Sequence, residues 1–259
     1  MISIITPTYN SGEYLERCIC SIMNQNVDVE HIIVDGGSKD NTIDIMKKYE
    51  SAYNMRWISE KDDGMYDAIN KGMKMAKGDI VAWLNADDQY MPWTLQVVQH
   101  VFEKRPDVRW ITGVPMRKYS EDTVSMTFNS KKVYPQWIIR GKGLRNGYYG
   151  TLQQESTFWR KDLWDKVGGV DAKYKLAGDF HLWCDFAHYA KLYTINSPLA
   201  CFTIRPGQKS GDRVAYNREQ GKPSFLCTLI KKLKLYRLVG LYSCILHKDQ
   251  LIRIEELER

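Results

Sequence analysis

The sequence predicts an α/β fold in which helices flank a mainly parallel central sheet. Short apolar or β-branched runs alternate along the chain with segments that repeat apolar residues at helical spacing. This alternation implies right-handed crossovers between parallel strands. The chain has 259 residues, 44% of them hydrophobic, which is enough for one large domain with a small appendage.

The predicted elements follow one another in chain order. A strand at residues 2–6 is halted by Pro7, which lacks a backbone N–H group. A helix at 65–77 is closed by Gly78, a residue type that favours a left-handed helix cap. The other predicted elements are helices at 13–24, 40–49 and 179–190, a helix opened by Pro92, strands at 31–34, 55–58, 80–84 and 108–114, and further strand within 191–204.

Two regions depart from this alternation. The pattern loosens over residues 116–150, which predicts a mobile basic loop. Its glycines, which stand among lysines and arginines, are Gly141, Gly143, Gly147 and Gly150. From Pro223 onward, apolar and basic residues are interleaved in the manner of a basic amphipathic helix or helical pair. We therefore expect a main domain at 1–221 and a basic helical tail at 222–259.

Charge and cysteine content limit the class of protein. The net charge of +6 suits anionic ligands or an anionic membrane surface. The six cysteines show no paired metal spacing, so free cytosolic thiols are expected. Met1 leads directly into the first strand, so we expect no secretory signal and a cytoplasmic location. No apolar stretch is long enough to span a bilayer.

Residues 85–88, Asn-Ala-Asp-Asp, are the most informative segment. They follow the apolar run at 80–84, so Asp87 and Asp88 are expected at the C-terminal tip of a buried strand, where α/β sheets bind ligands. Adjacent carboxylates repel unless they share a proton or a cation. A divalent cation, Mg²⁺ or Mn²⁺, would hold such a pair and also bind a diphosphate. Taken alone, the pair is more common in turns and helix caps.

Three other loops carry candidate ligand residues. Tyr9 follows the first strand and offers a flat ring that can stack on a base or pack on neighbouring loops. Asp35 ends the second strand and can accept a base N–H, as from uracil, or cap the following turn. Asp63 opens a helix whose free N–H groups can receive phosphate, and it would serve equally as an N-cap.

Taken together and in order, these segments resemble the inverting family 2 glycosyltransferases of the GT-A fold. The resemblance covers roughly the first 210 residues. Each motif is weak by itself, whereas the ordered set is highly specific. The matching segments are residues 4–10 (IITPTYN), 33–42 (IVDGGSKDNT), 63–72 (DGMYDAINKG), 85–88 (NADD), 153–160 (QQESTFWR) and 178–183 (GDFHLW).

The resemblance implies a role for each matching residue. Asp179 fills the place of the catalytic base, and Asp88, with Asp87 beside it, would ligate Mn²⁺ or Mg²⁺. The nucleotide-binding residues would be Thr6, Pro7, Tyr9, Asp35, Asp63, Gly64 and Asp87. The acceptor side would be lined by Glu155, His181 and Trp183. One departure is Arg205, which stands where relatives often carry a histidine and is well suited to hold a diphosphate.

The expected partners follow from the same reading. The donor would be a nucleotide sugar, with UDP favoured by the pair of Tyr9 and Asp35 and with GDP and dTDP left open. The acceptor would be a hydroxyl of a growing glycan or lipid-linked saccharide in the synthesis of cell-surface polysaccharide or lipopolysaccharide. The tail at 222–259 would bind the anionic inner face of the cytoplasmic membrane or would pack on the main domain with its lysines in solvent. No nucleic acid partner is expected.

Two other classes of protein remain as alternatives. A sugar nucleotidyltransferase would carry a glycine-rich loop with Arg or Lys after the first strand, and residues 7–14 lack one. A catalytically silent carbohydrate- or nucleotide-binding protein would have no need of both Asp88 and Asp179.

Overall fold

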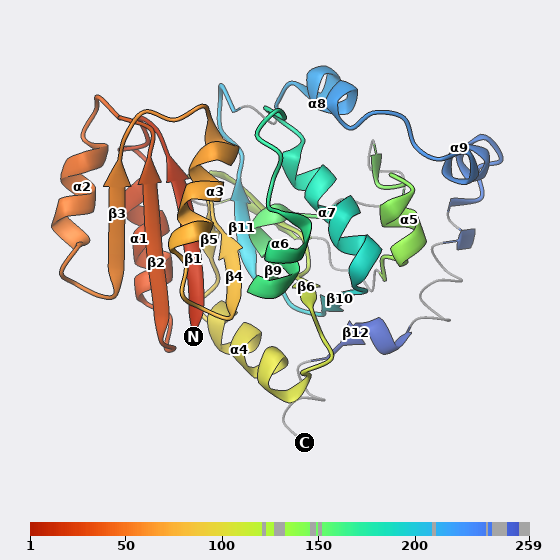
Figure 1. Ribbon diagram of the computed structural model, residues 1–259, viewed down its shortest axis with the longest axis horizontal. Helices are drawn as coiled ribbons and strands as arrows, with labels where there is room; N and C mark the ends of the chain where they lie inside the picture. The colour runs from red at the N-terminus through yellow and green to blue at the C-terminus, as the bar shows by residue number, and fades with distance from the viewer. Residues whose placement is uncertain are drawn as a thin grey trace.

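The computed structural model describes residues 1–120, 123–126, 133–145, 149, 152–208, 211–236, 238–239 and 248–253. Within them, eight strands form a large sheet in the order β12-β10-β6-β9-β4-β1-β2-β3 (Figure 1). Every pairing in this sheet is parallel except those of β9, so the prediction of a mainly parallel sheet is confirmed. The strands are β1 Ile2–Thr8, β2 Val29–Asp35, β3 Met55–Ser59, β4 Ile80–Trp83, β6 Trp110–Thr112, β9 Thr157–Arg160, β10 Leu192–Ile195 and β12 Leu251–Ile252.

A second, smaller sheet has the order β5-β11-β7-β8. Its strands are β5 Gln89–Tyr90, β7 Met116–Ser120, β8 Thr123–Met126 and β11 Ala200–Thr203. β11 runs antiparallel to β5 and parallel to β7. Because β5 directly follows residues 85–88, this sheet brings the end of β11 beside the Asn-Ala-Asp-Asp segment.

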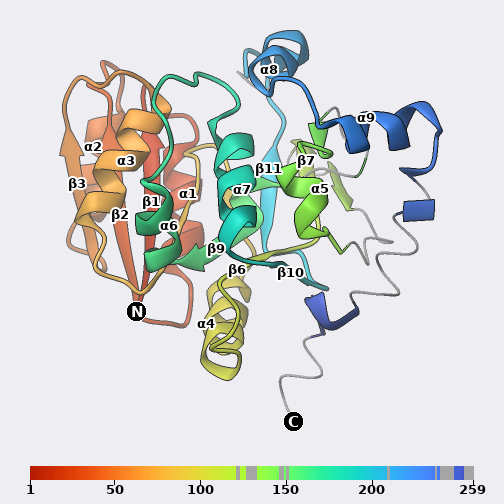
Figure 2. The ribbon, with the colours of Figure 1, turned by 45° about the vertical axis from the view of Figure 1, so that its right-hand side comes forward.

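Helices cover both faces of the large sheet, and α3, α6 and α7 lie on the same face (Figures 1 and 2). Side chains alternate between faces along a strand. In β2, Ile33 therefore packs with α1 and α2, whereas Ile32 and Val34 belong to the cluster that contains α3. The helices named so far are α1 Leu15–Met23, α2 Thr42–Tyr49, α3 Met65–Met75, α6 Lys161–Val167 and α7 Gly178–Tyr189.

The first strand is longer than predicted because Pro7 lies inside it, opposite Val34 of β2. The carbonyl of Ile5 accepts a hydrogen bond on the β4 side, and that of Thr8 accepts one on the β2 side. Backbone polar groups alternate in this way, so the nitrogen of Pro7 faces the side on which β4 has already ended. No ladder hydrogen bond is lost there, and the predicted halt at Pro7 is wrong.

The prediction that Gly78 caps α3 is also wrong. The C-cap is Ala76, whose backbone is extended at φ −64° and ψ 130°. Gly78 instead passes close to the start of β1, where its N–H donates to Ser3 Oγ at 2.8 Å. A Cβ on Gly78 would lie 2.8 Å from the carbonyl oxygen of Met1, so this glycine serves close backbone approach. Helix α4, Thr94–Lys104, likewise begins two residues after Pro92.

The core beneath the site is rich in tryptophan. Trp83 of β4 stacks on Trp183 of α7 with ring centroids 5.9 Å apart and planes 8° apart. Trp183 also stacks on Trp110 of β6, and Trp159 of β9 meets Trp83 edge-on. Aromatic side chains bury large apolar areas, so this cluster fixes α7 against the middle of the sheet.

The expected tail is partly built into the main domain. Residues Leu251–Ile252 form β12, which pairs with β10 at the edge of the large sheet. Helix α9, Phe225–Lys232, lies beside the turn after α5, Gln136–Arg140, where Ser224 N–H donates to Gly141 O at 2.8 Å. The expected loop residues Gly147 and Gly150 lie outside the described residues, as do the tail residues 240–247 and 254–259.

Across the part of the chain that the structure describes, no helix has both the length and the apolar character needed to cross a membrane.

Candidate active site

The C-terminal ends of β1, β2 and β4 meet at one edge of the sheet, at the top of Figure 1. The loops that leave this edge contain most of the candidate residues: Tyr9 after β1, Asp35 at the end of β2, and residues 85–88 after β4. This is the edge where ligands bind in α/β sheets.

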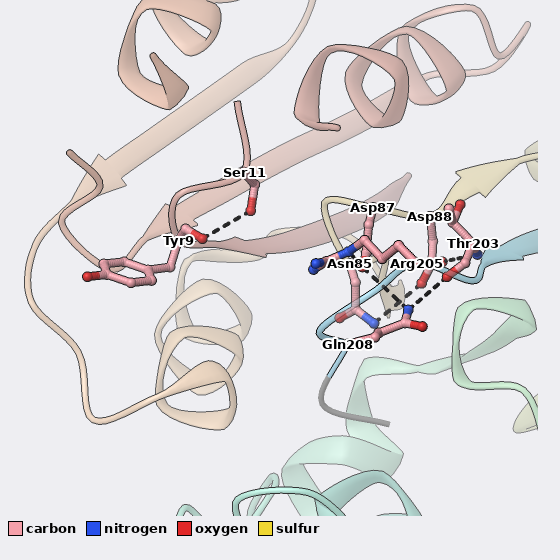
Figure 3. Close-up of polar contacts among 8 residues, drawn as sticks. All are labelled: Tyr9, Ser11, Asn85, Asp87, Asp88, Thr203, Arg205 and Gln208. Carbon is pink, nitrogen blue, oxygen red and sulfur yellow. Dashed lines mark hydrogen bonds and ion pairs between the residues drawn. The ribbon is translucent and has the colours of Figure 1, made fainter. Parts of the chain in front are cut away.

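Asp88 has no exposed surface. One carboxylate oxygen, Oδ1, accepts the backbone N–H of Thr203 at 2.8 Å, and the other, Oδ2, faces the Asn85 amide at 3.4 Å (Figure 3). Burial, followed by the charges of Glu155 and Asp87, raises the pKa of Asp88 well above its usual value. This side chain ties the end of β11 to the 85–88 turn. Its assignment as a metal ligand stays a prediction.

Asp87 is the partly accessible carboxylate of the pair. Its Oδ2 lies 2.6 Å from Arg205 Nε, and the Gln208 side-chain amide approaches the same oxygen at 3.5 Å (Figure 3). Arg205 follows β11 and lies over the ring of Tyr14, 4.8 Å from its centroid. The small sheet thus positions the Arg205 guanidinium beside Asp87, at the C-terminal end of β4.

The donor set at this tip fits a metal only in part. Among the described residues, no group of three or more His, Cys, Asp or Glu side chains is arranged to hold an ion. Of the two adjacent aspartates, only Asp87 has exposed surface, and 11% of its side chain is accessible to solvent. Mg²⁺ is commonly bound by one or two carboxylates together with substrate phosphates, so Asp87 fits a cation that arrives with a diphosphate.

Asp35 is fully buried and its carboxylate is engaged within the protein. Its Oδ2 accepts the backbone N–H groups of Gly37 and Ser38 and the hydroxyl of Ser59, at 3.0, 2.9 and 2.6 Å. Its Oδ1 accepts the Ser38 hydroxyl. Asp35 therefore holds the turn after β2, the second of its two expected roles, and its contact with a base stays a prediction.

Three nucleotide-binding candidates occupy different environments. Thr6 is buried, and its hydroxyl pairs with His31 Nε2 at 2.8 Å. Pro7 is also buried. Tyr9 is 61% exposed, with its ring directed away from the cluster around Asp87 (Figure 3). Tyr9 is thus free to meet a base at the surface.

Asp63 and Gly64 lie at the start of α3. Gly64 is the N-cap with φ 116°, a left-handed conformation, so the alternative role of Asp63 as N-cap is not observed. Asp63 is exposed, and both residues line a small cavity with Tyr174 and Lys175. Lys175 Nζ donates to the carbonyl of Asp63 at 3.0 Å, which joins this loop to the segment before α7.

Asp179 lies in the first turn of α7 and is half-buried. A Cβ on the preceding Gly178 would lie 2.7 Å from the Tyr66 ring, so glycine is required for α7 to start here. The hydroxyl of Tyr66 accepts the Gly178 N–H at 2.9 Å. Burial raises the pKa of Asp179 to about 6, against the effect of hydrogen bonds from the Phe180 N–H and Tyr216. A carboxylate with this pKa is suited to act as a general base near neutral pH.

Two residues near Asp179 were missed by sequence reasoning. Tyr216 and Glu219 lie on α8, Arg213–Glu219. The Tyr216 hydroxyl donates to Asp179, and the Glu219 carboxylate accepts backbone N–H groups just before α7. No motif marks either residue in the sequence. The only local signal for this helix is Asp212, whose carboxylate accepts the Ala215 N–H as an N-cap.

Glu155 is 3% exposed and lies in the short 3₁₀ helix η2, Gln154–Ser156. Its Oε1 has no hydrogen-bond partner among the described residues. Burial, together with the charges of Asp179 and Asp87, raises the pKa of Glu155 to about 8. Glu155 therefore interacts electrostatically with both Asp179 and Asp87.

Trp183 does not line an acceptor surface, whereas His181 is partly exposed. The His181 ring stacks on Tyr174 at 3.9 Å, and its Nε2 lies 2.9 Å from the carbonyl oxygen of Glu219. Trp183 is 2% exposed and belongs to the tryptophan core. The acceptor assignment of Trp183 is corrected accordingly, and that of His181 stays a prediction.

Comparison with known proteins agrees with this geometry. The family model described as glycosyl transferase family 2 matches residues 3–160. A PGL/p-HBAD biosynthesis glycosyltransferase of Mycobacterium tuberculosis is 30% identical over 200 residues, which cover 71% of this chain and 69% of that protein. An uncharacterized glycosyltransferase of Nostoc sp. is 27% identical over 233 residues, which cover 85% of this chain and 69% of that protein.

Solved structures confirm the predicted GT-A fold. TarS 1–349 of S. aureus, in complex with UDP-GlcNAc, superposes with a TM-score of 0.67 at 20% identity and covers 82% of this chain. The mannosyltransferase PcManGT of Pyrobaculum calidifontis, in complex with GDP-Man and Mn²⁺, gives a TM-score of 0.62 at 18% identity and covers 83%. This chain spans 60% of the length of each of these two structures.

Proposed function

The chain belongs to glycosyl transferase family 2, and we propose that it transfers a sugar from a UDP-sugar to an acceptor hydroxyl with inversion at the anomeric carbon. The observation that carries this proposal is the environment of Asp179. It is a half-buried carboxyl with a raised pKa of about 6, at the start of a helix. The electrostatic interaction of Glu155 with both Asp179 and Asp87 supports a single site that contains the base and the donor.

The proposed reaction is a single displacement. Asp179 accepts the proton of the acceptor hydroxyl while that oxygen forms a bond to the anomeric carbon. The bond from this carbon to the diphosphate breaks, and the nucleoside diphosphate leaves with the electron pair. A base with a pKa of about 6 is mostly ionised at neutral pH and still accepts a proton in the transition state.

We propose that Asp87, rather than Asp88, faces the divalent cation that accompanies the diphosphate. A bound Mg²⁺ or Mn²⁺ would neutralise negative charge on the leaving group. Asp88 accepts the Thr203 N–H and so holds the end of β11, which precedes Arg205, next to Asp87. Arg205, now paired with Asp87, is placed to bind the diphosphate directly when Asp87 is engaged by the cation.

A uridine donor is supported by two observations. Tyr9 presents an exposed ring beside the end of β1, where a base can stack. A structural relative, TarS, is described in complexes with UDP-GlcNAc and with UDP. Asp35 contributes by holding the turn at 35–38 in place, through hydrogen bonds from Gly37, Ser38 and Ser59.

The proposed acceptor is a glycan or lipid-linked saccharide in cell-surface polysaccharide synthesis, at the cytoplasmic face of a membrane. Mycobacterial relatives are named for PGL/p-HBAD biosynthesis. The helix α9 and the residues after it expose an apolar surface, which consists of Phe225, Leu226, Leu229, Leu233, Leu235 and Leu238. Basic residues accompany it, and residues 223–248 contain neither Asp nor Glu. This combination suits an anionic membrane surface.

Release of nucleoside diphosphate is the test of this function. The enzyme is incubated with Mn²⁺, a panel of nucleotide sugars and a panel of saccharide acceptors. A transferase releases UDP and yields a glycoside of inverted configuration. A sugar nucleotidyltransferase would require sugar phosphate and release pyrophosphate from UTP. Binding of donor without either product would identify a silent binding protein.

A further inference from the structure

Helix α8 is hydrogen-bonded to the start of α7 through Glu219, and we call this set of bonds the clamp. The Glu219 carboxylate accepts the backbone N–H groups of Lys175, Leu176 and Ala177, at 3.2, 2.9 and 2.9 Å. Its carbonyl oxygen pairs with His181 Nε2 at 2.9 Å. These bonds fix α8 over the turn that leads to Asp179, although α8 lies beyond the 3–160 family match.

The clamp places one side chain on the candidate base. The Tyr216 hydroxyl donates to the Asp179 carboxylate, 3.2 Å from Oδ1 and 3.4 Å from Oδ2. The Tyr216 ring is half-buried and packs against the main hydrophobic core, so its position is fixed by more than this one bond. Burial raises the pKa of Tyr216 well above its usual value, which keeps the hydroxyl protonated as a donor.

We propose that Tyr216 is the positioning residue of the general base, with its hydroxyl holding the Asp179 carboxylate in place and in its charged form. This inference rests on the proposed function of Asp179 as a base. Hydrogen bonding to a carboxylate stabilises the anion and opposes the effect of burial. Without the Tyr216 hydroxyl, a larger fraction of Asp179 would be protonated near pH 6 and unable to accept a proton.

Other titratable groups lie on the elements around Asp179. Tyr66 of α3 contacts the Asp179 backbone, Glu155 lies on η2, and Glu219 accompanies Tyr216 on α8. His181 lies on α7 itself, with its ring turned to Tyr174. None of these is removed when Tyr216 is replaced by phenylalanine, so a change in the titration of Asp179 is attributable to the lost hydroxyl.

The first measurement needs no substrate. Carboxyl ¹³C chemical shifts are followed against pH in the full chain, with the Asp179 signal assigned by its loss in Asp179→Asn. Tyr216→Phe should raise the pKa of Asp179 by about half a unit to one unit, the equivalent of one hydrogen bond. Replacement of Tyr216 by 3-fluorotyrosine, a stronger donor, should lower it. An unchanged Asp179 titration in a folded Tyr216→Phe protein would overturn the proposal.

The second measurement is the pH profile of transfer. For a pKa rise of one unit from about 6, Tyr216→Phe should lower kcat about fivefold at pH 6 and hardly at pH 8.5, with UDP affinity unchanged. Tyr189→Phe is the matched control, because it removes an exposed hydroxyl from the other end of α7. An equal loss at both pH values would assign Tyr216 a purely structural role. Absence of transfer by the wild type would contradict the proposed function, while the ¹³C titration would still decide the role of Tyr216.

Discussion

Arg205 Nε lies 2.6 Å from Oδ2 of Asp87, although the two residues are 118 positions apart in the chain. The pair joins the end of the small sheet to the acidic tip of the large one (Figure 3). Asp88 makes the neighbouring link by accepting the N–H of Thr203. The two adjacent aspartates therefore differ in environment. Asp87 is partly accessible and pairs with Arg205, whereas Asp88 is buried and holds the Thr203 backbone.

The first prediction distinguishes the role of Asp87 from that of Asp88. Asp87→Asn should abolish the dependence of UDP binding on Mn²⁺, because it removes the accessible carboxylate. Asp88→Ala should lower the free energy of unfolding by about 1–3 kcal/mol, because the Thr203 N–H loses its buried acceptor. Asp88→Asn keeps an acceptor oxygen for that N–H and removes only the charge, and Mn²⁺ dependence should persist in it. Calorimetric titration with UDP and thermal denaturation of the variants provide the readouts. Loss of metal dependence in a well-folded Asp88→Asn protein would restore Asp88 as the ligand.

The second prediction concerns competition for Asp87. Arg205→Gln should increase the affinity of the nucleotide-free enzyme for Mn²⁺, since the carboxylate loses its paired cation. The same change should weaken UDP binding about 10–100-fold, the value of a charged hydrogen bond of about 1.5–3 kcal/mol. Electron paramagnetic resonance reports bound Mn²⁺. Arg105→Gln, which breaks an ion pair with Asp107 elsewhere on the surface, is the matched control and should leave both affinities unchanged.

The third prediction is a pH dependence of stability at Glu155. Its pKa is raised from 4.5 to about 8, so the folded state resists ionisation. The free-energy cost that ionisation of Glu155 imposes on the folded state is absent below pH 4.5, grows as pH rises, and is complete above pH 8. Glu155→Gln should therefore stabilise the protein at pH 8.5, by up to about 5 kcal/mol, and have little effect at pH 4.

Urea denaturation at the two pH values measures this difference. The exposed Glu103→Gln in α4 is the control and should change stability equally at both. Equal effects of Glu155→Gln at pH 4 and pH 8.5 would show that Glu155 is not held protonated.

The fourth prediction concerns the apolar surface of α9. The protein should float with vesicles that contain anionic lipid, and added salt should release it because exposed charges are screened. The double change Phe225→Ser and Leu226→Ser should abolish flotation, since these side chains are 82% and 52% exposed. Val214→Ser, at an apolar residue 71% exposed on α8, should not. Indifference of the unchanged protein to anionic vesicles would leave α9 with a packing role only.

The fold was largely predictable because strand and helix periodicities are local. The errors at Pro7 and Gly78 share one cause. The role of each residue is set by its contact with a neighbouring strand and not by the sequence of its own segment. The nitrogen of Pro7 faces a position where β4 has ended, and Gly78 makes room for the start of β1. Neither neighbour is visible in a local pattern.

The site was less predictable because motifs give residue types without their burial. Asp35, Asp88 and Trp183 match family positions, yet each is buried and bonded or packed internally. Conversely, Tyr216 and Glu219 carry no motif and reach Asp179 only through tertiary packing of α8 on α7. Tail residues such as Arg237 and Leu241, on which part of the membrane hypothesis rested, lie outside the described residues.

The central claim is that Asp179 is the base of an inverting sugar transfer, and Asp179→Asn tests it most directly. The amide keeps the size of the carboxyl and removes its basicity. Initial rates of glycoside formation should fall ~10²–10⁴-fold, the usual contribution of a general base, while the Kd for UDP in Mn²⁺ stays close to that of the wild type. A variant that keeps more than about a tenth of the wild-type rate would contradict the claim and make Glu155 the next candidate.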